Sequence, residues 1–184
     1  MRVIKNILSQ LHIYVIWLIL ATLLWSWIFL FVTDTVRTKK VMVFIDAACQ
    51  DVELRMELEK DMPKGLRMIQ VRPFSYFLFD DENLLRADIY IVPASKVEAY
   101  RDSFTPLNGG ELPGYTVSSE GGIRIYDAAA GSGAAKEFIT YTVPGEEGED
   151  YYLFFGAQSV HSAFANETGD DAALAVAEAL LHLH

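Results

Sequence analysis

The sequence of 184 residues contains little cysteine, little proline and no surplus of positive charge. Its single cysteine, Cys49, excludes an internal disulfide, so cysteine usage does not determine the redox compartment. Lysine and arginine number 15 against 25 aspartates and glutamates, and the formal net charge is −10. Because nucleic-acid binding needs basic patches that neutralise phosphates, this balance argues against a nucleic-acid partner. It also argues against a domain that lies flat on an anionic membrane.

The common signatures of enzymes and nucleotide sites are missing as well. The sequence has no P-loop, no G-x-G-x-x-G, no H-E-x-x-H and no G-x-S-x-G. We therefore expect a protein that is not an enzyme, with no catalytic residues, no bound metal and no cofactor.

A long apolar segment is present near the N-terminus. Residues 13–32 (IYVIWLILATLLWSWIFLFV) contain no charged residue, and all three tryptophans lie within them. As a helix this segment is about 30 Å long, which matches the hydrocarbon core of a bilayer. A buried core helix is the other reading of such a run. We predict a short N-terminal tail at residues 1–12 followed by a transmembrane helix at residues 13–32.

The apolar segment also invites comparison with a cleaved signal peptide. Such a peptide has an apolar region of about 7–15 residues and a small-residue cleavage site, which is lacking here. We therefore predict an uncleaved signal anchor in the cell membrane. Arg2 and Lys5 precede the segment and Arg37, Lys39 and Lys40 follow it, so the positive-inside rule does not decide the orientation. A short tail before an anchor favours a single-pass chain with an extracytoplasmic C-terminal domain.

The sequence predicts one α/β domain at residues 39–184, after a polar connector at residues 33–38. The apolar run at residues 41–45 is typical of a strand buried on both faces. Strand and helix patterns then alternate with short connections: helix 51–62, strand 66–71, helix 80–86, strand 89–92 and helix 96–102. This rhythm predicts a mostly parallel sheet in a three-layer arrangement. Further strands are expected at 123–126, 138–143 and 151–155, and a final helix at 170–183.

Part of this domain resembles a known family. The carrying motifs are KKVMVFIDAACQDVELRMELEKDMPKGLRMIQV, the strand ADIYIV at residues 87–92 and the exit FTPL at residues 104–107. They are similar to the first lobe of the extracellular solute-binding proteins of bacterial ABC importers. The resemblance implies a periplasmic-binding-protein-like fold of one lobe only, because the roughly sixty residues after Ile125 are too few for a second lobe.

Candidate binding residues follow from where ligands bind in α/β sheets. Open sheets of this kind bind ligands outside the carboxyl ends of their strands. The polar residues at or near these ends form a candidate binding edge: Asp46, Cys49, Ser75, Tyr76, Ser95, Asp127, Ser159 and His161. The alternative interpretation is that Asp46 and Ser95 only cap helices.

Two sharper hypotheses concern Cys49 and His161. A helix start can lower a thiol pKa, but nucleophilic catalysis also needs a base, and His161 is the credible partner. Asp46 and Asp51 would oppose a thiolate, so we expect Cys49 to lie in an ordinary strand-to-helix turn. A metal site would need ligands from His161 with Asp170 or Asp171, without any recognisable ligand spacing.

The leading functional hypothesis is a non-enzymatic, membrane-anchored binding or accessory module. It would recognise a protein partner or membrane complex through the strand-end edge, and the aromatic segment at residues 74–79 is either core or part of that surface. The alternative, which the resemblance implies, is a solute-capture component of an ABC importer. An enzyme that uses Cys49 and His161 is the remaining option.

Overall fold

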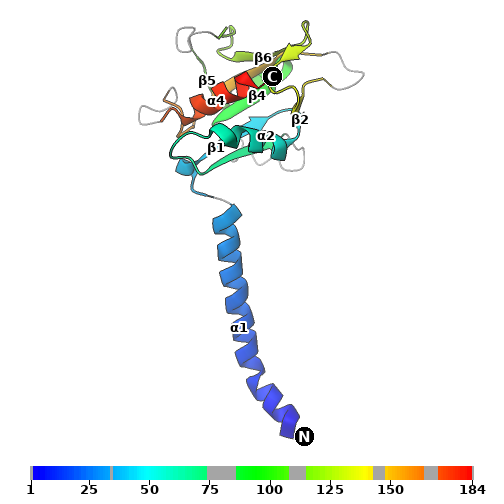
Figure 1. Cartoon of the computed structure of the whole chain (residues 1–184), viewed down its shortest axis with the longest axis vertical. Coiled ribbons are helices and arrows are strands. Elements are labelled where there is room, and N and C mark those ends of the chain that lie inside the picture. The colour runs from blue at the N-terminus through cyan, green and yellow to red at the C-terminus, as the bar shows by residue number, and fades with distance from the viewer. Residues whose placement is uncertain are drawn as a thin grey trace. The chain divides into compact units, whose positions relative to one another are not determined.

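The computed structural model describes residues 2–33, 35–73, 86–107, 115–142, 148–163 and 170–183 (Figure 1). The chain divides into two compact units, Met1–Val36 and Arg37–His184. The first unit is built on helix α1 (Arg2–Thr33), whose side chains are described at residues 11 and 13–29. These side chains are all exposed, and Trp25 reaches 72%. Among the residues that the structure describes, no helix is long and apolar enough to cross a membrane.

The second unit is an α/β domain with a seven-stranded sheet. Its strands are β1 (Lys40–Ile45), β3 (Met68–Pro73), β4 (Ile89–Pro93), β5 (Phe104–Thr105), β6 (Ile123–Asp127), β7 (Ser132–Gly133) and β9 (Tyr151–Gly156). They lie in the order β3-β1-β4-β9-β6-β7, and β5 pairs with β9. A separate two-stranded sheet joins β2 (Ala48–Cys49) to β8 (Ile139–Thr140).

The sheet is mixed. β1 pairs in parallel with both β3 and β4, as the alternating strand and helix patterns predict. β9 lies between β4 and β6 and is antiparallel to both. The α/β class is therefore confirmed, with one parallel half and one antiparallel half. The reversal at β9 decides which residues share an edge of the sheet.

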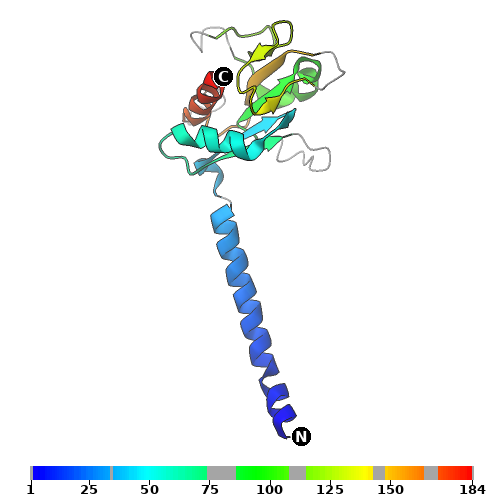
Figure 2. The same cartoon turned by 45° about the vertical axis from the view of Figure 1, so that its right-hand side comes forward.

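Alternating side chains build two separate cores on the two faces of the sheet. One face of β1 contributes Val41, Val43 and Ile45, and α2 (Asp51–Leu58) and α4 (Ala172–His182) pack against this face (Figure 2). The opposite face carries a smaller, more aromatic cluster: Phe44, Ala87, Tyr90, Val92, Val97, Tyr100 and Phe154. The sheet thus separates a helical layer from a thinner layer of short turns.

In the thinner layer, the helix expected at residues 96–102 does not form as an α-helix. The chain forms two 3-10 segments instead, η4 (Ala94–Lys96) and η5 (Glu98–Ser103). Val97, Tyr100 and Ser103 are the residues of this stretch that point inward and are buried. A spacing of three residues places side chains one above another in a 3-10 helix, so this geometry presents all three to the sheet.

Other boundaries differ from the sequence prediction by a few residues. The helix expected at 51–62 ends as an α-helix at Leu58 and continues as η2 (Glu59–Asp61). Of the strand expected at 138–143, the described residues form β8, which pairs with the two-residue β2, and residue 143 lies outside the described part of the chain. The helix expected at 80–86 and the aromatic segment at 74–79 fall almost entirely outside the described residues.

Candidate functional site

The carboxyl ends of β1, β4 and β6 meet at one edge of the sheet, which we call the carboxyl edge. Asp46 follows β1 and is buried, with its backbone N–H donating to the Ile91 carbonyl at 2.8 Å. Its carboxylate accepts Lys96 Nζ at 3.0 Å and the Tyr100 hydroxyl at 3.1 Å. Asp46 therefore links the 3-10 segments η4 and η5 to the end of β1. It does not cap α2, whose N-cap residue is Gln50.

Two further predicted residues lie at the carboxyl edge. Ser95 is exposed, and its backbone N–H donates to the Glu149 carboxylate at 3.0 Å. Asp127 ends β6, accepts the Ala130 N–H at 3.0 Å and pairs with Arg124 at 3.0 Å. Ser75 and Tyr76 lie outside the described residues. The edge is thus a set of charged and polar groups held by hydrogen bonds and ion pairs, some of which join segments far apart in the chain.

Cys49 lies near the same edge, but its thiol does not ionise readily. It pairs with Ile139 across the β2–β8 ladder and is half-buried. Burial, and secondarily the charge of Asp51, raises the pKa of the Cys49 thiol to about 12. The thiol is therefore protonated at neutral pH.

Ser159 and His161 lie at the opposite edge of the sheet. β9 is antiparallel to β4, so the residues after Gly156 return to the edge where β1 and β4 begin. The length of a six-residue strand, about 20 Å, separates this edge from Cys49. Sequence reasoning placed both residues at the carboxyl edge because it extended the parallel pattern to the last strand. The structure does not bring Cys49 and His161 together.

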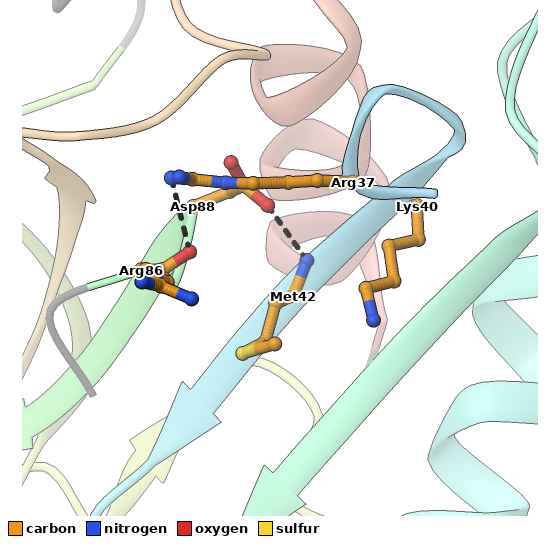
Figure 3. Close-up of a pocket in the computed structure, with 5 residues that line it drawn as sticks. All are labelled: Arg37, Lys40, Met42, Arg86 and Asp88. Carbon is orange, nitrogen blue, oxygen red and sulfur yellow. Dashed lines mark hydrogen bonds between the residues drawn. The ribbon is translucent and has the colours of Figure 1, made fainter. Parts of the chain in front are cut away.

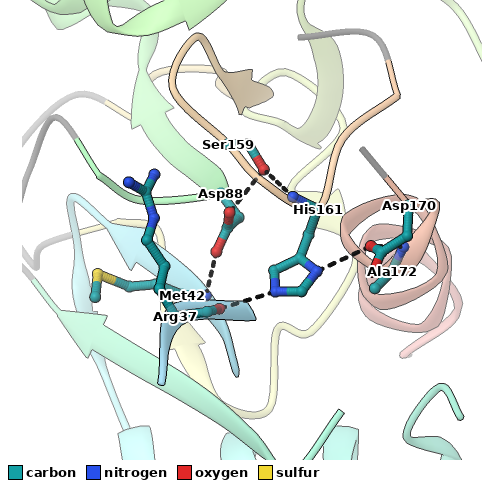
Figure 4. Close-up of polar contacts among 7 residues, drawn as sticks. All are labelled: Arg37, Met42, Asp88, Ser159, His161, Asp170 and Ala172. Atoms are coloured by element: carbon teal, nitrogen blue, oxygen red, sulfur yellow. Dashed lines mark hydrogen bonds and ion pairs between the residues drawn. The ribbon is translucent and has the colours of Figure 1, made fainter. Parts of the chain in front are cut away.

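At this opposite edge, a buried polar network centres on Asp88, which immediately precedes β4 (Figure 4). Its carboxylate accepts the Met42 N–H at 2.8 Å and the Ser159 hydroxyl at 2.6 Å. Ser159 Oγ in turn accepts the His161 N–H at 3.1 Å. Burial raises the pKa of Asp88, while these hydrogen bonds and the charges of His161 and Arg37 act in the other direction.

The His161 ring extends the same network to α4. Its Nδ1 lies 2.9 Å from Asp170 Oδ1, and its Nε2 lies 3.0 Å from the Arg37 carbonyl oxygen. Asp170 also accepts the Ala172 N–H at the start of α4 at 3.1 Å. Both ring nitrogens are thus engaged by the protein itself, and the described residues contain no group of three or more potential metal ligands.

A pocket of about 140 Å³ opens beside this network (Figure 3). It is lined by Arg37, Lys40, Met42, Arg86 and Asp88. Arg37 donates from Nη2 to the carbonyl oxygens of Arg86, at 3.5 Å, and of Gln158. The sequence pattern does not reveal this pocket, because Arg86 lies far along the chain from Arg37 and Lys40. The one available signal was Asp88, a carboxylate at the start of an otherwise apolar strand.

Comparison of the chain with family models, with curated proteins and with solved structures finds no match. The class that the geometry defines is an α/β domain with a mixed sheet, preceded in the chain by an apolar helix.

Proposed function

We propose that the chain is a membrane-anchored binding module, in which α1 anchors an extracytoplasmic domain that recognises a protein partner. The observation that carries the anchor is the surface of α1. All of its described side chains are exposed, and they include Trp17, Leu18, Leu23 and Trp25 at 62–72%. A helix that is apolar on all sides needs an apolar environment around it, and a bilayer supplies one.

The sequence supports an anchor of full length. Residues 13–32 carry no charge and would extend for about 30 Å as a helix. Burying apolar surface is favourable by about 25 cal/mol per Å², so leaving this helix in water would be strongly unfavourable. The expected orientation, with the domain outside the cytoplasm, belongs to the same proposal.

The carboxyl edge is the surface proposed for the partner. Ser95 is exposed there, and the carboxylates of Asp127 and Glu149 are held in place by backbone N–H groups. Polar groups that are fixed before binding lose little conformational entropy when a partner docks. A non-enzymatic role fits this edge, because the Cys49 thiol is protonated and His161 lies at the other edge.

The test begins with the intact chain in its membrane. Sodium carbonate at high pH should leave the chain in the membrane pellet, and its release into the supernatant would contradict the anchor. Extraction in mild detergent followed by affinity purification should then recover a protein partner. A strictly monomeric extract would contradict the partner, and a solute-dependent rise in thermal stability would favour solute capture instead.

Two matched variants locate the partner surface. Ser95→Arg places a bulky cation at the carboxyl edge, whereas Ser119→Arg makes the same change at an exposed turn before β6, near the opposite edge. We expect Ser95→Arg to reduce partner recovery about tenfold or more, the effect of a cost of about 1.4 kcal/mol. Equal recovery with both variants would rule out the carboxyl edge.

A further inference from the structure

The pocket between the starts of β1 and β4 has the size and charge of an anion site. Liquid water occupies about 30 Å³ per molecule, so a pocket of about 140 Å³ has room for a small tetrahedral anion. Three of its lining residues are cationic (Arg37, Lys40 and Arg86), and one is a carboxylate, Asp88. The described lining residues therefore carry two more positive than negative charges, in a chain whose net charge is −10.

Arg37 supplies the strongest sign of a ligand. Its Nη2 donates to the carbonyl oxygen of Arg86 (Figure 3) and also to that of Gln158. These two bonds hold the guanidinium in the wall of the pocket. Its Nε is buried and has no hydrogen-bond partner among the described residues. Buried donors in proteins are nearly always paired, so this N–H calls for an acceptor that the described chain does not supply.

Asp88 opposes an anion less than its charge suggests. Both of its oxygens are occupied, one by the Met42 N–H and the other by the Ser159 hydroxyl. Burial also raises its pKa, which favours the neutral carboxyl when further negative charge approaches. The Asp88 carboxylate thus lines the pocket, and its hydrogen bond with the Met42 N–H holds the backbone of β1 in place.

We propose that the pocket formed by Arg37, Lys40 and Arg86 binds a phosphate group. The planar fork of arginine and the compact charge of lysine both suit phosphate oxygens. Two sources carry this chemistry: a soluble phosphate compound and the headgroup of an anionic phospholipid. The second source rests on the proposed membrane anchor, because Arg37 follows the last residue of α1 by four positions and basic residues beside a membrane helix attract anionic headgroups.

The first experiment uses inorganic phosphate with the full chain in neutral detergent. Thermal unfolding of the domain is followed by circular dichroism, with chloride at equal ionic strength as the reference. At ten times its dissociation constant, phosphate should raise the midpoint by about 3–6 °C. Phosphate also stabilises proteins generally through exclusion from their surface, so the result is read as a difference between variants.

The variants are Arg86→Gln and Lys40→Gln, each of which removes one pocket cation. Arg86→Gln keeps the backbone carbonyl that Arg37 binds, so the fold should persist. Lys136→Gln is the control, because Lys136 is exposed between β7 and β8 and does not line the pocket. Each pocket variant should weaken phosphate binding about tenfold or more, as expected for a lost charged hydrogen bond, and the control should match the parent chain.

The second experiment places the same four chains in vesicles of phosphatidylcholine, with or without one quarter phosphatidylglycerol. If the bound phosphate is a lipid headgroup, anionic lipid should raise the thermal unfolding midpoint of the parent chain and of Lys136→Gln. It should not raise the midpoint of the two pocket variants. A response to phosphate alone assigns a soluble ligand. Equal responses of all four chains in both experiments would overturn the phosphate site. A chain that does not associate with vesicles would contradict the anchor and leave the first experiment valid.

Discussion

The Asp88 carboxylate and the Ser159 hydroxyl lie 2.6 Å apart, although 71 positions separate these residues in the chain. Asp88 precedes β4 and Ser159 follows β9, so this contact closes the antiparallel pair at one end. Asp88 also holds the Met42 N–H within β1. One buried carboxylate thus connects three segments of the domain.

Asp88→Ala should therefore destabilise the domain. The substitution leaves the Met42 N–H and the Ser159 hydroxyl without their acceptor, and each such buried group costs about 1–3 kcal/mol. We expect a loss of about 2–5 kcal/mol in urea unfolding of the full chain in neutral detergent. The control is Asp102→Ala at an exposed position, which should change stability by less than about 0.5 kcal/mol. Equal stability of the two variants would contradict the network.

The pH dependence of stability offers a separate test of Asp88. Burial is the largest influence on its pKa and raises it, while the hydrogen bonds from Ser159 and Met42 and the charges of His161 and Arg37 lower it. A raised carboxyl pKa stabilises the fold fully below the unfolded value of about 3.9, and this stabilisation is lost as pH rises through the folded pKa.

Asp88→Asn provides the comparison, because an amide does not titrate. Its oxygen can accept the Met42 N–H, and its NH₂ can donate to the Ser159 oxygen once that hydroxyl rotates. The advantage of the parent chain over Asp88→Asn should shrink as the pH rises above about 4, the unfolded pKa of an aspartate. A constant or growing advantage in urea unfolding would show that the pKa of Asp88 is not raised.

His161→Gln should destabilise the domain for a related reason. The ring joins the Arg37 carbonyl oxygen to the Asp170 carboxylate, and both partners are acceptors. The His161 ring is buried, although Asp170 is exposed, so losing these partly buried contacts should cost about 1–3 kcal/mol, a fall of about 2–10 °C in the unfolding midpoint. His182→Gln makes the same change at an exposed position on α4 and should have almost no effect. A similar midpoint for both variants would exclude a structural role for the ring.

The parallel half of the fold could be predicted from the sequence, because local patterns specify it. The apolar run of β1 predicts a strand, the charged helical pattern after it predicts a crossover, and β4 repeats the strand pattern. The position of β9 could not be predicted in this way. Its strand pattern is equally compatible with either direction, and its pairing with β4 is set by contacts between distant segments.

The candidate site shows the same limit. Asp46, Ser95 and Asp127 do share an edge, because β1 and β4 are parallel neighbours and β6 runs in the same direction as β4 on the other side of the antiparallel β9. Ser159 and His161 lie at the opposite edge and not at the predicted one, because β9 runs antiparallel to β4. The Arg37, Lys40 and Arg86 pocket has no local signature, because only folding brings Arg86 next to Arg37 and Lys40.

Cys49 should react slowly with thiol reagents in the folded chain. A rise of its pKa from 9.0 to about 12 lowers the thiolate population at neutral pH about a thousandfold. Because the chain has one cysteine, any incorporation of iodoacetamide reports this residue alone. We expect labelling at pH 7.5 to be at least about a hundredfold faster in concentrated urea than in native detergent solution. Comparable rates in the two solutions would show an accessible, ionisable thiol.

Gly156 should tolerate no side chain, because β9 approaches the segment before β4 closely at this residue. A Cβ there would lie 2.0 Å from the Ala87 carbonyl oxygen and 3.1 Å from the Tyr90 ring. The backbone cannot easily move away, since the Gly156 N–H donates to the Asp88 carbonyl oxygen at 2.9 Å. Gly156→Ala should therefore destabilise the domain by about 3 kcal/mol or more.

Gly131→Ala separates this steric effect from the usual cost of replacing glycine. Gly131 has a φ of +59°, and nothing lies within 4 Å of the position of its Cβ. Its substitution should cost only the left-handed backbone penalty, about 1–2 kcal/mol. Urea unfolding of both variants measures the difference. If Gly156→Ala were no more destabilising than Gly131→Ala, the two segments would have to lie farther apart, and the contact that positions Asp88 at the end of β9 would be refuted.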